Sequence, residues 1–196
     1  MRRRELMTSS MLVGVALPAR AATRPALSTP RGPALLTVTG AITRNNRGPL
    51  DPSLDQLMVK QKVTFDKAFA FDFAALAGLP VISIRPTLEY DGKPHTLTGP
   101  LLSDVARAAG APATDTTRLL LRAIDGYVVA LSLADARRYR YIVAWGLDGQ
   151  PMPLGGLGPL WAVFDADRFG DFAAKPLDQR FAACPWGLYH IEVQAG

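Results

Sequence analysis

The chain has 196 residues, of which 48% are hydrophobic and 20% charged, an ordinary balance for a single globular domain. Its formal net charge is +5, but residues 1–21 hold four of the 22 basic residues and one of the 17 acidic residues. The remaining 18 basic and 16 acidic residues leave a nearly neutral chain, with no basic stripe of the kind that binds nucleic acid. A nucleic-acid partner is therefore excluded.

Residues 1–21 have the three parts of a secretory signal. An arginine run at 2–4 precedes an apolar run at 11–19, and small residues follow at the cleavage position. Arg3 and Arg4 also resemble a twin-arginine export signal, with an arginine-rich general secretory signal as the alternative. The apolar run is shorter than the roughly 20 residues that span a bilayer core. We expect residues 1–21 to be a removed signal peptide, and the mature chain to be periplasmic without a membrane span.

The first half of the mature chain alternates apolar runs with turn formers. Residues 22–34 are rich in proline and small residues and predict a flexible leader, before a single domain at 35–196. The β-rich run Leu35–Ile42 predicts the first strand, and alternating apolar residues favour another strand within 58–70. A short helix at 73–77 is expected between Asp72 as its cap and Gly78 as its stop.

The middle of the chain predicts a strand and a longer helix. Alternation beginning at Val81 predicts a strand, and Asp91-Gly92 signals a hairpin after it. The segment Thr96–Gly110 predicts a helix, because Pro100 suits a first helical turn and Gly110 suits a stop.

Three short apolar runs in the second half predict buried strands, each bounded by turn formers. The expected elements are strands at 119–121, 141–147 and 160–164, a short helix at 132–138, a polar loop at 165–179 and a closing strand at 188–193. The pairs Asp125-Gly126 and Asp148-Gly149 mark turns between them.

Several dispersed motifs resemble the sulfite-oxidase-like molybdopterin-binding domain. They are Thr-Gly-Pro-Leu-Leu at 98–102, Asp-Gly-Tyr at 125–127, Asp-Gly-Gln-Pro-Met-Pro at 148–153, Gly-Pro-Leu-Trp at 158–161 and Ile-Glu-Val at 191–193. The resemblance covers residues 35–193. It implies an α+β fold of mixed β-sheets with short helices, a molybdopterin-type molybdenum cofactor, and oxidoreductase chemistry on a small-molecule substrate.

The same resemblance implies a role for Tyr127. In that family a tyrosine after this turn hydrogen-bonds an oxygen ligand of molybdenum or the substrate, which suits a neutral phenol. The alternative is a tyrosine with its ring in the core and its hydroxyl in water. Cations are expected near a pterin phosphate, and Arg85, His95 and Arg118 are the weaker candidates, with solvated side chains as the alternative.

The family's metal ligand has no counterpart in this chain. That ligand is a cysteine thiolate between the strand and the Thr-Gly-Pro helix, yet residues 84–98 contain no cysteine. The single cysteine, Cys184, is interpreted as a small apolar residue near the core, and His190 is expected on the outer face of the closing strand. No metal ligand is assigned. Two functions remain: a molybdenum-dependent oxidoreductase, or a cofactor-free periplasmic binding or accessory module that keeps the fold and acts on a small molecule or a protein partner.

Overall fold

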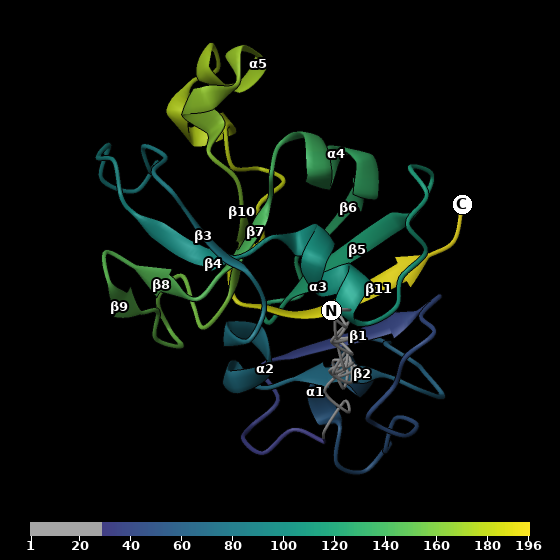
Figure 1. The fold of residues 1–196 in the computed structure, drawn as a ribbon. Coiled ribbons are helices and arrows are strands. Elements are labelled where there is room, and N and C mark those ends of the chain that lie inside the picture. The colour runs from purple at the N-terminus through teal and green to yellow at the C-terminus, as the bar shows by residue number, and fades with distance from the viewer. Residues whose placement is uncertain (1–28) are drawn as a thin grey trace, which may run out of the picture.

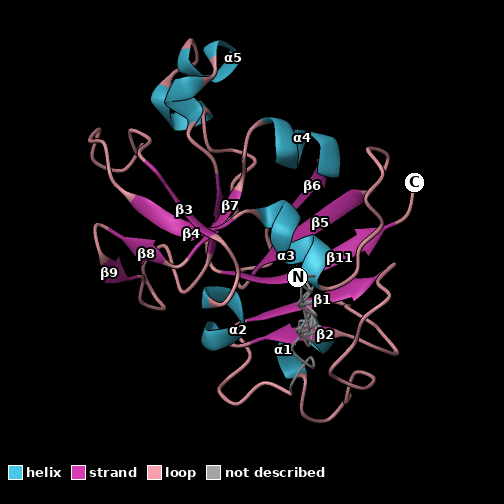
Figure 2. Ribbon diagram, viewed as in Figure 1, coloured by secondary structure: helices cyan, strands magenta, loops and turns pink. Residues whose placement is uncertain are grey.

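A computed structural model describes residues 29–196 as an α+β domain of three β-sheets with short helices (Figures 1 and 2). The predicted signal peptide and residues 22–28 of the predicted leader lie outside the described residues. The mixed-sheet α+β class predicted from the sequence is confirmed.

The largest sheet has five strands in the order β2 (Phe69–Phe71), β1 (Leu36–Gly40), β11 (Leu188–Gln194), β5 (Arg118–Ala123) and β6 (Val128–Ser132). Only the β1–β11 pair is parallel, and the other neighbours are antiparallel. The closing strand therefore lies at the centre of the sheet, beside the first strand of the domain.

The other two sheets are smaller. A four-stranded sheet has the order β3 (Val81–Ile84), β4 (Leu97–Pro100), β8 (Gly146–Leu147) and β9 (Gln150–Pro151). A two-stranded sheet pairs β7 (Ile142–Ala144) with β10 (Trp161–Val163). Figure 1 shows β7 and β10 between the five-stranded sheet and the β3–β4 arm.

The helices are all short, of four to seven residues. They are α1 (Gln56–Lys60), α2 (Phe73–Ala77), α3 (Leu102–Ala108), α4 (Leu133–Arg138) and α5 (Gly170–Ala173), with 3-10 turns η1 (Ala166–Arg168) and η2 (Leu177–Gln179). Within residues 29–196, no helix is long and apolar enough to cross a membrane.

The core is continuous across the sheets and is rich in aromatic side chains. Trp161, Tyr141 and Phe164 are fully buried. Phe164 packs against Tyr141 and Phe172 with ring centroids 4.7 Å from each, which ties α5 to the residues that flank the two-stranded sheet.

The predicted cap at Asp72 and the predicted turn at Asp148-Gly149 are present, and Ser132 is a further cap that was not predicted. The side chain of Asp72 accepts a hydrogen bond from the Ala75 amide, and that of Ser132 accepts one from the Asp135 amide. Asp148 and Gly149 both have positive φ, as a two-residue hairpin turn requires.

Three predicted segments were wrong. Residues 97–100 form strand β4, and the helix begins only at Leu102. Gly99 is the reason, because a Cβ there would lie 2.0 Å from the Val143 carbonyl oxygen, so only glycine fits under β7. Within 58–70, α1 replaces the first part of the predicted strand, and residues 165–179 form helical turns in place of a loop.

Candidate functional site

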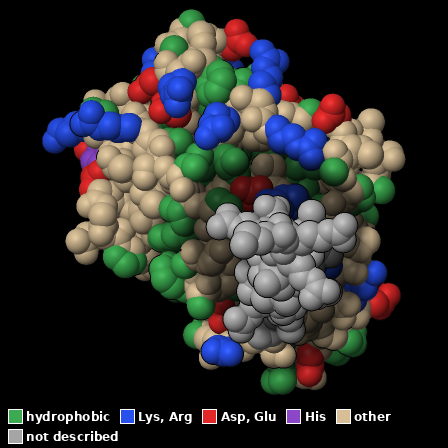
Figure 3. Space-filling view, viewed as in Figure 1, with side chains coloured by type: hydrophobic (Ala, Val, Ile, Leu, Met, Phe, Trp, Pro, Cys, Tyr) green, Lys and Arg blue, Asp and Glu red, His purple; other side chains and the backbone are tan. Residues whose placement is uncertain are grey.

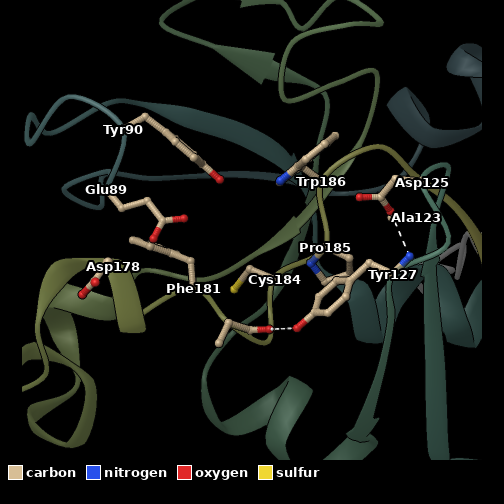
Figure 4. Close-up of a pocket in the computed structure, with 11 residues that line it drawn as sticks. Glu89, Tyr90, Ala123, Asp125, Tyr127, Asp178, Phe181, Cys184, Pro185 and Trp186 are labelled. Atoms are coloured by element: carbon tan, nitrogen blue, oxygen red, sulfur yellow. Dashed lines mark hydrogen bonds between the residues drawn. The ribbon is translucent and has the colours of Figure 1, made fainter.

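A cavity of about 200 Å³ lies beside Tyr127, where the β5–β6 hairpin meets the segments before β4 and before β11. We call it the Tyr127 pocket. Its lining residues come from three stretches of the chain and include four aromatic rings, three carboxylates and the only thiol: Glu89, Tyr90, Ala123, Asp125, Tyr127, Asp178, Phe181, Ala182, Cys184, Pro185 and Trp186 (Figure 4).

Tyr127 is held by the turn that precedes it. The backbone amide of Tyr127 donates to the Asp125 side chain at 2.9 Å, and Gly126 has a φ of 94°, which glycine adopts without strain. The Tyr127 hydroxyl donates to the Ala182 carbonyl at 2.6 Å, although half of the residue is exposed. Its proton is therefore engaged, while its oxygen keeps lone pairs that can accept a hydrogen bond from a ligand.

The opposite wall is formed by Glu89, Tyr90 and Trp186. Figure 4 shows the Tyr90 hydroxyl and the Trp186 indole nitrogen pointing toward one another across the pocket, with the Glu89 carboxylate beside them. Partial burial and the neighbouring Glu89 carboxylate raise the pKa of Tyr90 to about 12. The Tyr90 phenol is thus neutral at ordinary pH.

The floor of the pocket contains the buried thiol of Cys184. Trp161 anchors this segment by donating its indole N–H to the Cys184 carbonyl at 2.8 Å. Burial raises the pKa of the Cys184 thiol to about 12. The thiol is therefore neutral, which makes it neither a ready nucleophile nor a ready metal ligand.

Of the four site residues predicted from the sequence, only Tyr127 lines this pocket. Arg118 is exposed at the far end of β5, where it pairs with Ser132 and Gln194. Arg85 is exposed just after β3. The structure does not bring the four side chains together.

His95 is engaged by two carboxylates. Its Nδ1 lies 2.6 Å from an Asp148 oxygen, and its Nε2 lies 3.0 Å from an Asp91 oxygen. These hydrogen bonds raise the pKa of His95 and lower those of both aspartates. His95 therefore joins the hairpin after β3 to the β8–β9 turn, and both its ring nitrogens are already paired.

His190 was predicted on the outer face of β11, and this was wrong. Its side chain is fully buried, and its Nε2 lies 2.9 Å from the Thr39 hydroxyl. Burial lowers the pKa of His190 to about 4. The cause is that other parts of the domain cover both faces of β11 here, because the consecutive residues Leu188–Ile191 are all buried.

A second cavity, of about 220 Å³, has the opposite charge. We call it the arginine cavity, since Arg138, Arg140 and Arg168 line it together with Ile84, Tyr139, Asp165 and Phe169. The Arg138 guanidinium lies over the Tyr139 ring, 5.1 Å from its centroid. Figure 3 shows basic side chains gathered on this face over α4 and the α5 segment.

The donor groups only partly suit a molybdenum cofactor. The guanidinium groups of the arginine cavity suit a phosphate, and an Asp165 oxygen there is buried without a hydrogen-bond partner among residues 29–196. The metal is not accommodated, because the single thiol is neutral and lines the other cavity. In the described part of the chain, no three His, Cys, Asp or Glu side chains form a group that could hold a metal ion.

Sequence reasoning missed Glu89, Tyr90 and Trp186. They belong to two segments nearly a hundred residues apart, and neither segment has a spacing that points to a site. Only the fold brings them together around Tyr127.

No family model matches the chain, and no curated protein matches it. Among solved structures, the chain is similar to the sulfane dehydrogenase SoxCD from Paracoccus pantotrophus, with a TM-score of 0.53 and 10% sequence identity. The match covers 81% of this chain and 37% of that chain, so this chain spans well under half of that protein's length. The likeness supports a distant relationship in fold to that protein. At this identity it speaks for the fold alone.

Proposed function

We propose that this chain is a periplasmic small-molecule-binding module that keeps a sulfite-oxidase-like fold and works without a molybdenum centre. The Tyr127 pocket carries this proposal. It is a cavity with aromatic walls and a few polar groups, as ligand sites are. Its lining includes no Lys, Arg or His to hold a pterin phosphate, and its thiol is neutral.

A molybdopterin-dependent oxidoreductase is the second candidate. It is supported by the distant likeness in fold to a sulfane dehydrogenase and by the arginine cavity. When bound, the cofactor would supply oxygen-atom or electron transfer. Arg138, Arg140 and Arg168 would hold its anionic group, but no described residue replaces the missing thiolate.

Analysis of bound small molecules tests the proposal. The full-length chain is expressed in a host that makes and exports molybdopterin, recovered from the periplasm, weighed intact, and then denatured so that released molecules can be identified. We expect a chain that begins at residue 22 and releases a small organic molecule other than pterin. Tyr127→Ala should lose most of this ligand, because it removes one wall of the pocket.

The matched control is Val128→Ala, which truncates the next residue, 41% exposed against 50% for Tyr127 and outside the pocket lining. It should retain the ligand. Release of a stoichiometric pterin, or equal ligand content in both variants, would contradict the binding-module proposal. A product that still carries Met1 would contradict export.

A further inference from the structure

The charge of the Tyr127 pocket is one-sided. Glu89, Asp125 and Asp178 line it. Within residues 29–196, none of these three carboxylates forms an ion pair, whereas most other described aspartates do. Figure 4 shows Glu89 and Asp125 on opposite sides of the pocket. A ligand entering between them meets negative charge from both sides, which attracts a cation and repels an anion.

The aromatic walls favour the same charge. Tyr90, Tyr127 and Trp186 are 55%, 50% and 37% exposed, which is high for large apolar side chains. All three line one cavity. The face of an aromatic ring carries partial negative charge, and aromatic rings with nearby carboxylates are a usual setting for organic ammonium ions.

The hydrogen bond of the Tyr127 hydroxyl further restricts the chemical class of the ligand. Because its hydroxyl proton goes to the Ala182 carbonyl, its oxygen offers the pocket an acceptor. An N–H donor matches that acceptor. The cavity of about 200 Å³ has room for roughly six water molecules at about 30 Å³ each, so the ligand is small.

We propose that the Tyr127 pocket binds a small alkylammonium ion, with its charge between Glu89 and Asp125 and against the rings of Tyr90 and Trp186. This inference rests on the proposed binding-module function and names the class of ligand. It is separate from the arginine cavity, whose charge suits anions.

Calorimetric titration with three probes of matched size tests it: n-butylammonium, n-butyrate and n-butanol. Only n-butylammonium should bind measurably to the full mature chain, and its affinity should fall as salt is raised. Glu89→Gln should weaken this binding at least tenfold, and Tyr90→Leu about three-fold, the size expected for one cation–π contact. Asp66→Asn is the control, since it removes one exposed carboxylate outside the pocket and should leave the affinity unchanged.

Amide chemical shifts, recorded during the same titrations, locate the probe and show that each variant is folded. Shifts confined to the segments around residues 89, 127 and 186 support the proposal. Equal or tighter binding of butyrate or butanol in this pocket would overturn the cation assignment and leave the binding module standing. If no probe binds, the alkylammonium proposal falls, whereas the binding-module function is decided separately by the released-ligand analysis.

Discussion

At the scale of single residues, the two histidines have opposite roles. His95 is held by two carboxylates near the surface, so its folded pKa is raised and it favours folding below about pH 6.5. That contribution is lost as the pH rises through the folded pKa. His190 is buried and its pKa is lowered to about 4, so it makes the folded state resist protonation.

We predict that His190 limits stability in acid. The unfolded chain takes up a proton near pH 6.5, whereas the folded chain does so only near pH 4. Stability is therefore fully present above the unfolded pKa and is lost as the pH falls toward the folded one, by about 3 kcal/mol. His190→Leu should flatten this part of the curve. Denaturant unfolding of both proteins at pH 7, 5.5 and 4 measures it, and an equally steep loss in the variant would contradict the assignment.

Residue types predicted turns and the Asp72 cap well, but they did not predict which side chains of a strand are buried. Alternation within residues 188–193 identified a strand, and one face was expected to be in solvent. In the structure Leu188–Ile191 are all buried, so other parts of the domain cover both faces of this part of β11. The sequence pattern of the strand alone does not report what packs on its two faces.

At the scale of elements, sequence signals predicted structure correctly where contacts between residues close in the sequence determine it. Asp72 caps α2, as predicted. The helix predicted from Thr96 was wrong at its start because of a tertiary contact. Gly99 packs against the backbone of β7, where no side chain fits, and residues 97–100 pair with β3 as a strand. That approach involves residues more than forty positions apart, so no window around Pro100 contains it.

We predict that Asp72 stabilises the segment at residues 31 and 32 as well as helix α2. One carboxylate oxygen accepts from the Ala75 amide, and the other accepts from the Arg31 and Gly32 amides at 2.8 and 3.1 Å. Asp72→Ala should lower the free energy of unfolding by about 2 kcal/mol, because a cap and two further amide partners are lost. Asp72→Asn should cost less, since asparagine still caps.

The control for Asp72 is Asp66→Ala, at an exposed aspartate with no side-chain hydrogen bond within residues 29–196. It should leave unfolding nearly unchanged. If Asp72→Ala were as mild as this control, the contacts of residues 31 and 32 would contribute nothing, and the predicted leader at 22–34 would be the better description of that segment.

At the scale of the whole molecule, the sequence motifs predicted the α+β class with mixed sheets, and the likeness to a sulfane dehydrogenase supports a distant relationship in fold. The site could be predicted only in part from the sequence, because Tyr127 lines a pocket whose other walls come from around residues 89 and 186. The cations that suit a phosphate and the only thiol line two separate cavities. The fold is thus compatible with a cofactor-free binding module and with a molybdenum-dependent oxidoreductase, and the molybdenum content of the purified protein distinguishes the two.

Molybdenum per chain is the most direct measure. The protein is purified from a host that makes and exports molybdopterin, and molybdenum is determined by elemental analysis against protein concentration, with pterin measured on the same sample. With no thiolate between residues 84 and 98 and a neutral Cys184, any metal would be held only weakly. We expect molybdenum far below one atom per chain after extensive dialysis. One tightly held molybdenum and one pterin per chain would contradict the binding-module account and establish the cofactor-dependent one.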